Sequence, residues 1–268
     1  MSYHRFFAQS DNAQDYRIGE TVTLHLDDQD FHHATRVVRL RTGESIEVVL
    51  RDLWSTYRGE VVEIGKDALS VRITDQVPST ELPVLCDLFW GYAKGDKNEQ
   101  IVRQTVEIGI NRLVPVLFKR CEANTDPERG TRKVERLQKI ACSAAMQAHR
   151  SVIPHVEAIT SFDKACAQLF AYDVVIVAWE QAHRASFSKT VDRVLSKTAG
   201  FDKDDRHIAL VIGPEGGIDP GEAQALWAQG AQLVSMGASI LRVETACTVA
   251  CGILADRIQA SFARQRSA

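Results

Sequence analysis

The sequence lacks the long apolar runs that mark proteins of membranes and secretory routes. Its longest apolar stretches, such as Val174–Trp179, fall far short of the ~20 residues that span a bilayer. The first residues, Met1–Phe7, lack the apolar core of a signal peptide. Six cysteines among 268 residues form no Cys-x-x-Cys pair, which argues against a disulfide framework. These absences favour a soluble protein in a reducing cytoplasm.

The sequence also lacks an excess of basic residues and a metal-ligand motif. Lys and Arg number 32 against 35 Asp and Glu, so the net charge of −3 gives no sign of nucleic-acid binding, which must rest on a local surface. Cys247 and Cys251 lie four residues apart in an apolar helical pattern, without a histidine at ligand spacing. We interpret them as buried thiols and expect no metal.

The first eighty residues are typical of a small β-barrel-like domain. Short β-branched runs separated by turns predict four strands, at Thr21–Leu26, Ser45–Leu50, Tyr57–Ile64 and Ala68–Thr74. A helix is expected at about Asp30–Leu40. Pro78–Pro83 has the composition of a linker. We therefore predict a first domain over residues 1–78.

Residues 79–268 alternate between strand and helix patterns, which indicates an α/β domain with a mostly parallel sheet. The expected strands are Val84–Trp90, Leu113–Phe118, Val174–Trp179, Ile208–Ile212 and Leu233–Met236. Two capping boxes predict helix starts, one at Asp96 with Glu99 and one at Asp219 with Glu222. Further helices are expected at about Lys133–Ala148 and Thr245–Phe262.

Two glycine-containing loops follow buried strands of this domain. The first is Gly213-Pro-Glu-Gly-Gly217, and it matches neither the dinucleotide-binding nor the P-loop fingerprint. The second runs over Ser235–Leu241 and leads to Arg242 and Glu244. Loops at the carboxyl edge of a parallel sheet bind ligands, so the pair predicts a cleft for a small cofactor. Two alternatives stay open: the glycines serve close packing, and Arg242 and Glu244 form a salt bridge that fixes the turn.

These loops carry a resemblance to a known family. Gly213–Gly217 followed by Leu241-Arg-x-Glu-Thr-Ala246 resembles the RsmE family of ribosomal RNA uridine-N3 methyltransferases, of the SPOUT superfamily. Further segments follow in family order: Arg5-Phe6, His33–Arg39, Lys94–Lys97, Glu107–Gly109, Pro115, Arg120-Cys121 and Gln138–Ile140. The resemblance implies a PUA-like RNA-binding β-barrel domain, then a SPOUT α/β domain with a deep trefoil knot. It further implies a homodimer that uses S-adenosylmethionine to methylate N3 of one uridine in 16S ribosomal RNA of the small subunit.

The resemblance also implies site residues. The expected cofactor contacts are Ala178, Trp179, Ile212, Gly213, Glu215, Gly216, Gly217, Met236, Gly237, Ile240, Leu241 and Thr245. Arg242 is expected to stabilise the uracil anion, whereas Glu244 is the nearest candidate for a base, although a structural carboxylate is the favoured interpretation. The expected RNA contacts are Arg5, His33, Arg36, Arg39, Arg120 and Arg150.

Local charge accompanies these RNA contacts. Residues 119–150 contain eight Lys or Arg against four acids, and Arg36, Arg39 and Arg41 cluster beside two histidines. Charge alone would indicate only solvated helix faces. Two positions depart from the family pattern. Leu137 stands where the family has Trp, and Met146-Gln-Ala-His-Arg150 replaces Glu-Gln followed by Gly-Arg or Ser-Arg, so detailed RNA contacts of this helix are not carried over.

Two other functions stay open from the sequence. One is a related knotted enzyme that methylates tRNA or a ribose 2′-hydroxyl; the His33–Arg39 and Lys94–Lys97 segments argue against it. The other is a non-catalytic rRNA-binding assembly factor, against which the intact glycine loops and Arg242 argue. An apolar face on the last helix, through Ala246, Val249, Ala250, Ile253 and Leu254, supports the homodimer or simply packs on its own sheet.

Overall fold

The computed structural model describes residues 3–11, 15–51, 55–122, 127–182, 185–196 and 207–266. The chain divides into two compact units. The first contains residues 1–81 together with 145–152, and the second contains residues 82–144 and 153–268. The expected boundary after residue 78 therefore shifts slightly, and residues 145–152 belong to the first unit instead of the second.

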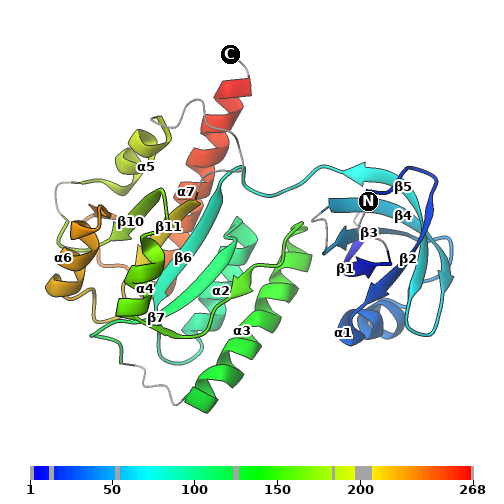
Figure 1. Ribbon diagram of the computed structural model, residues 1–268, viewed down its shortest axis with the longest axis horizontal. Helices are drawn as coiled ribbons and strands as arrows, with labels where there is room; N and C mark the ends of the chain where they lie inside the picture. Colours follow the sequence, from blue (N-terminus) through cyan, green and yellow to red (C-terminus); the bar gives the residue numbers. More distant parts are fainter. Residues whose placement is uncertain are drawn as a thin grey trace. The chain divides into compact units, whose positions relative to one another are not determined.

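The first unit is a closed barrel, as predicted, with five strands instead of the four expected, because the strand at His4–Ser10 was not predicted; Figure 1 shows the barrel in blue and cyan. Its strands are β1 (His4–Ser10), β2 (Thr21–Leu26), β3 (Ser45–Leu50), β4 (Ser55–Ile64) and β5 (Leu69–Val77). They follow the order β1-β2-β5-β4-β3, and a parallel β1–β3 pair closes the barrel. Alternate residues of β2, such as Val22 and Leu24, point into the core, which also holds Phe6, Ile46 and Tyr57.

The helical segment of the barrel departs from the expected regular helix over 30–40. It begins as α1 (Asp28–His32) and continues as a π-helix, η1 (His33–Val38). Arg39 ends it with a left-handed backbone, at φ 57°. Arg36 and Arg39 therefore do not share one face of a single α-helix, because the wider π turn and the left-handed residue separate them.

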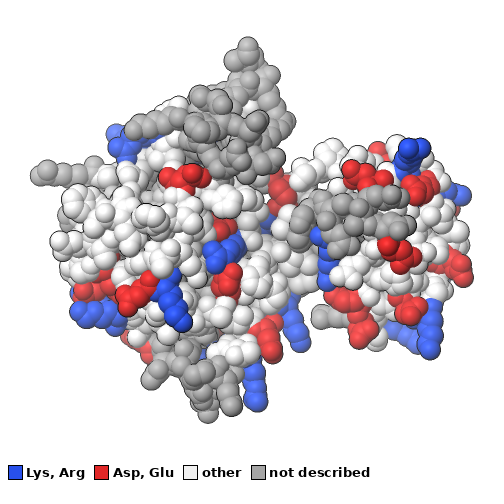
Figure 2. Space-filling model, viewed as in Figure 1, with Lys and Arg blue, Asp and Glu red and all other residues white. Residues whose placement is uncertain are grey.

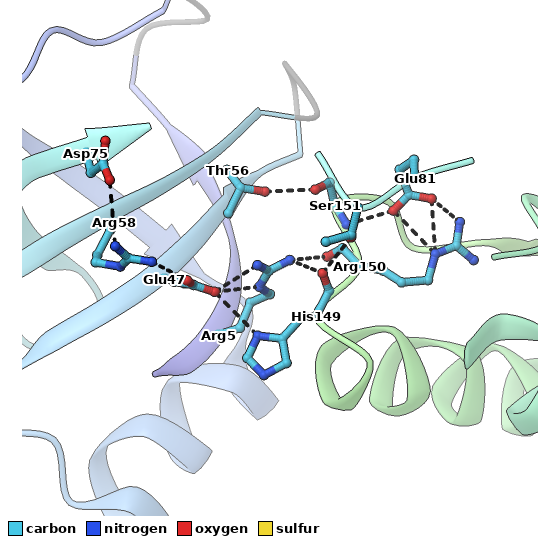
Figure 3. A network of polar contacts seen from close by, with 10 residues as sticks. Arg5, Glu47, Thr56, Arg58, Asp75, Glu81, His149, Arg150 and Ser151 are labelled. Atoms are coloured by element: carbon cyan, nitrogen blue, oxygen red, sulfur yellow. Dashed lines mark hydrogen bonds and ion pairs between the residues drawn. The ribbon is translucent and has the colours of Figure 1, made fainter. Parts of the chain in front are cut away.

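Buried ion pairs join residues 145–152 to the barrel (Figure 3). Arg5 donates to Glu47 Oε2 from Nη2 at 2.7 Å and from Nε at 3.1 Å, and its Nη1 donates to the carbonyls of His149 and Arg150. The Glu81 carboxylate accepts from the Arg150 guanidinium and, at 2.8 Å, from the backbone N–H of Ser151. These bonds engage both buried guanidinium groups within the protein and explain why the segment belongs to the first unit.

The second unit is built on a parallel sheet, also as predicted, with seven strands where five were expected; the two short strands at His155–Val156 and Thr160–Ser161 were not predicted. The strands are β6 (Leu85–Gly91), β7 (Arg112–Leu117), β8 (His155–Val156), β9 (Thr160–Ser161), β10 (Val174–Ala178), β11 (His207–Ile212) and β12 (Gln232–Val234). Their order is β12-β10-β11-β6-β7-β8, with β9 also beside β7. The trefoil knot implied by the resemblance stays a prediction.

Helices cover both faces of this sheet (Figure 1). They are α2 (Lys97–Ile108), α3 (Pro127–Gln147), α4 (Phe162–Leu169), α5 (Phe187–Ser196), α6 (Pro220–Ala228) and α7 (Val243–Arg266). Phe89, Val177 and Val211 face α4 and α6, in a core that includes Leu169 and Leu226. Helix α7 packs on β11 and β6 together with α2 and α5.

The two predicted capping boxes have different outcomes. The box at Asp219 forms, because its side chain accepts from Gly221 N and its own N–H donates to Glu222. The box at Asp96 does not form, because Asp96 makes no side-chain cap and Glu99 pairs instead with Arg136 of α3 at 2.8 Å.

Candidate active site

A cavity of about 260 Å³ lies at the carboxyl ends of β10, β11 and β12. These strands are neighbours in the sheet, so the loops that follow them meet although they lie far apart in sequence. All the expected cofactor residues except Thr245 line the cavity. Thr245 is exposed on α7, which turns Val243 and Ala246 inward instead. Cofactor contact by these residues stays a prediction.

The cavity has further lining residues that were not among the expected contacts. They are Glu180, Pro214, Ser235, Ala238, Ser239, Val243 and Ala246. Most belong to the same three loops as the expected residues. They could have been predicted from the sequence because they are direct neighbours of those residues along the chain. Val243 and Ala246 lie in the first turn of α7, where only the direction of the helix decides which residues face the cavity.

The glycines of the first loop are required by packing. A Cβ on Gly216 would lie 2.8 Å from the carbonyl oxygen of Arg120, and one on Gly213 would lie 2.6 Å from Ile218 Cγ1. Gly217 has φ +73°, and a Cβ there would meet the Glu180 carboxylate at 2.7 Å. These glycines therefore serve close packing, which was one of the two alternatives left open by the sequence. Close packing beneath the loop is compatible with a ligand in the cavity that the loop lines. A side chain at Gly216 would displace Arg120 before it met a ligand.

A group of charges lies at the rim of the cavity. Glu215 Oε1 accepts from Lys97 Nζ at 2.9 Å and from Lys94 N at 3.3 Å. Burial alone would raise the pKa of Glu215, but the bonds from Lys97 and the backbone outweigh it and hold that pKa low. The pKa of Lys97 is raised, first by Glu215 and then by the charge of Glu244, against the opposing charge of Arg242. Lys97 was not among the expected site residues, although it lies in the Lys94–Lys97 segment.

Arg242 and Glu244 do not form the salt bridge considered from the sequence. Arg242 is exposed and, among the described residues, makes no ion pair. Glu244 is 8% exposed, does not line the cavity, and has no described hydrogen-bond partner at Oε2. Thr248, one turn further on, donates to Gln104 of α2 at 2.7 Å, so this face of α7 meets α2. The position of Glu244 favours the structural interpretation over a base at the cavity.

The expected RNA contacts separate into exposed and buried side chains. His33, Arg36 and Arg39 are exposed, and within the described part of the barrel unit the two arginines have no ion-pair partner. Arg5 and Arg150 are 7% and 3% exposed and are fully engaged within the protein. An RNA phosphate cannot reach their guanidinium groups in this structure, so we reassign both to the joint between the barrel and residues 145–152.

The basic segment 119–150 is partly neutralised. Arg120 bonds the carbonyl of Gly216 and the Asp219 carboxylate, both at 3.4 Å, and Arg136 pairs with Glu99. Asp126 and the side chains of Glu128 and Arg129 lie outside the described part of the chain. Leu137, one of the departures from the family pattern, is buried, and Met146 is half-buried. On the face in Figure 2, basic and acidic side chains are interspersed, without a continuous patch of one sign.

The described part of the chain lacks two kinds of feature. It holds no group of three or more His, Cys, Asp or Glu side chains that could bind a metal ion. It also holds no helix with both the length and the apolar character to cross a membrane.

Comparison with known proteins identifies the family. Residues 80–255 match the model of an RNA methyltransferase domain, and residues 26–74 match an RNA methyltransferase PUA domain. Ribosomal RNA small subunit methyltransferase E of Bacillus subtilis is 28% identical over 90% of this chain and 92% of its own length. The protein of that name from Mycobacterium tuberculosis is 31% identical over 87% of each chain.

Solved structures agree with these sequence relatives. A crystal structure of a hypothetical protein superposes with a TM-score of 0.83 at 27% identity, over 96% of this chain and 99% of that one. A ribosomal RNA small subunit methyltransferase E from Neisseria gonorrhoeae, bound to S-adenosyl methionine, gives 0.70 at 25% identity, over 94% and 96%. The barrel, the parallel sheet, the cavity and both matched domains lead to one conclusion: this chain belongs to the RNA methyltransferase family.

Proposed function

We propose that this protein transfers a methyl group from S-adenosylmethionine to N3 of one uridine in 16S ribosomal RNA. The observation that carries the proposal is the cavity between three loops at the carboxyl edge of the sheet, with Lys97 bonded to the lining residue Glu215 and Arg242 between the lining residues Leu241 and Val243. The Neisseria gonorrhoeae relative is described with this cofactor bound, and the relatives named above are small-subunit rRNA methyltransferases.

The residues of the cavity fit such a cofactor. Ile212, Leu241 and Ala246 offer apolar surface for a purine ring, while the loop backbones and Ser235 offer polar groups. Glu180 and Glu215 supply negative charge toward a cationic ligand. When bound, S-adenosylmethionine supplies a methyl group that its sulfonium already activates, so the protein mainly has to hold the nucleophile in line with it.

The target nitrogen sets the remaining chemical requirement. Uridine N3 carries a proton and becomes a nucleophile only after losing it. The exposed guanidinium of Arg242 can stabilise the resulting anion, because its charge is not neutralised by a described carboxylate. His33, Arg36 and Arg39 would hold RNA on the barrel, where exposed and unpaired cations can meet phosphates.

We further propose a homodimer in the cytoplasm. Much of the apolar face expected on the last helix is buried within the chain itself, as at Ala250 and Leu254. Ile240, 89% exposed, and Val249, 41% exposed, are the apolar residues that a second copy would cover. Light scattering should give about twice the 29.8 kDa of one chain; a fully active species of about one chain mass contradicts the dimer.

The decisive experiment is mass spectrometry of 16S rRNA nucleosides from a deletion strain, followed by treatment of that RNA with the purified protein. The proposal expects 3-methyluridine to be absent and then restored, on free rRNA or on the assembled subunit. Restoration of a ribose-methylated nucleoside in this RNA, or methylation of tRNA treated in parallel, instead supports a related methyltransferase. Cofactor binding by calorimetry without any methylation supports an assembly factor.

A further inference from the structure

We propose that Lys97 is a further functional residue of the methyl-transfer site, acting with Arg242 to stabilise the uracil anion from which N3 attacks the methyl group. The inference rests on the function proposed above. It gives a second cation the role of stabilising the uracil anion, which the sequence analysis expected of Arg242 alone. It starts from the position of the Lys97 ammonium group.

The first observation is that two elements hold Lys97 at the rim of the cavity. Lys97 begins α2, and its Nζ lies 2.9 Å from Oε1 of Glu215, which lines the cavity. The same oxygen accepts from the backbone N–H of Lys94 at 3.3 Å. Glu215 therefore ties the turn before α2 to the glycine loop, and this double anchorage fixes where the ammonium group stands.

The second observation is that the start of α7 brings Arg242 and Glu244 to the same place. Helices α2 and α7 pack together, and Thr248 of α7 bonds Gln104 of α2 at 2.7 Å. Lys97 lies two turns before Gln104, and Glu244 lies one turn before Thr248, so both are on the facing surfaces. The charges that act on Lys97 are Glu215 from the glycine loop and Glu244 and Arg242 from the start of α7.

The third observation concerns the balance of these charges. Lys97 is bonded to the lining residue Glu215, and Arg242 lies between the lining residues Leu241 and Val243, so two cations border the cavity, and cations bordering a cleft attract an anion. The buried Glu244 does not line the cavity, and after the bond to Glu215 its negative charge further raises the pKa of Lys97 and so keeps the ammonium group charged. Lys97 itself keeps 35% of its side chain exposed toward solvent.

The chemistry of the proposed substrate matches this arrangement. The N3 proton first leaves to water or hydroxide, and the charge left on the uracil spreads over N3 and the two neighbouring carbonyl oxygens. The N3 lone pair then forms the bond to the methyl carbon while the carbon–sulfur bond breaks, and its electron pair stays on sulfur as a neutral thioether. Two fixed cations at the rim lower the energy of the anion and therefore the pKa of N3 in the complex.

The test is the pH profile of single-turnover methylation with saturating cofactor and RNA, for the full-length wild type and Lys97→Met. The wild-type rate should rise with pH and level off at the pKa of bound uracil. Lys97→Met should be on the order of 10²-fold slower below that point, as for the loss of one oxyanion donor. Its levelling point should move up by about two pH units, since tenfold corresponds to one unit, and the two rates should converge at high pH.

Control variants separate this role from a structural one. Lys97→Arg keeps the charge and should keep the wild-type levelling point. Arg103→Met removes an exposed charge from the same helix and should leave the profile unchanged. A rate loss in Lys97→Met that is equal at every pH, or that follows a loss of cofactor affinity in calorimetry, overturns the inference. A wild-type protein that methylates no uridine N3 refutes the proposed function itself, which is a different outcome.

Discussion

Replacing Arg5 by Met tests whether this residue serves the fold or RNA. The side chains of Arg5 and Glu47 are only 3% and 7% exposed, and breaking a buried ion pair costs about 3–5 kcal/mol. Glu47 keeps Arg58 at 3.1 Å and His149 at 3.4 Å, so we expect the lower end, about 3 kcal/mol. The barrel should open more easily, whereas the affinity for RNA at low temperature should hardly change.

Hydrogen exchange read by mass spectrometry measures this effect on the barrel alone. A loss of 3 kcal/mol corresponds to about 10²-fold faster exchange in peptides of β3 and β4. Arg72→Met is the matched control, because the Arg72–Glu60 pair is exposed at 49% and 38% and should contribute less than about 1 kcal/mol. Unchanged exchange in Arg5→Met together with weaker RNA binding would show that Arg5 leaves its pocket to bind RNA.

The same pair predicts how stability depends on pH. Burial alone would raise the pKa of Glu47, but hydrogen bonds from Arg5 and Arg58 outweigh it and lower that pKa. Glu47 therefore stabilises the barrel above the pKa of an unfolded glutamate, about 4.3, and this contribution is lost as the pH falls through the lower folded value. The decline in acid should be shallower in Arg5→Met. If the stability of both proteins falls equally steeply in acid, other carboxylates cause the loss.

Three further predictions concern the two binding surfaces. Gly216→Val should weaken S-adenosylmethionine binding in calorimetry by moving the loop away from Arg120, and unchanged affinity would remove this loop from the cofactor site. Arg36→Ala with Arg39→Ala should leave cofactor affinity intact and reduce the salt dependence of RNA binding by up to about two phosphate contacts; an unchanged salt slope in filter binding would place the RNA elsewhere. Arg242→Ala should bind RNA nearly normally but methylate on the order of 10²-fold more slowly in single turnover, and lost RNA affinity at a normal rate would reverse the roles.

The sequence predicted those features that depend on neighbouring residues. The capping box at Asp219 forms because its partner Glu222 lies three residues away, on the same turn. The one at Asp96 does not form, and Glu99 pairs instead with Arg136, 37 residues along the chain. The glycine loops could be predicted to border one cavity because each follows its strand directly.

Features that depend on contacts between residues far apart in the sequence could not be predicted from local patterns. The role of Lys97 depends on Glu215, which lies 118 residues away. The burial of Arg5 depends on carbonyl groups 144 and 145 residues away. The π-helix at His33–Val38 has only 6 residues, too few to show an apolar period different from that of an α-helix, so the segment was predicted as ordinary helix. Local pattern thus located the cavity, whereas tertiary contacts decided which charged side chains face it.

The discontinuous composition of the barrel unit has a consequence for synthesis on the ribosome. Residues 1–81 contain every strand of the barrel and the buried Arg5–Glu47 pair, yet Arg5 also donates to the carbonyls of His149 and Arg150, and the Glu81 carboxylate accepts from Arg150 and Ser151. A nascent chain that has emerged only to residue 81 therefore lacks the groups that bond the remaining donors of Arg5 and the Glu81 carboxylate in the finished protein. The N-terminal unit reaches its full set of contacts only later, because closing it needs a contact across about 145 residues and the entropy that such a loop costs. A fragment ending at the apparent linker should for the same reason be less stable than the barrel in the intact chain.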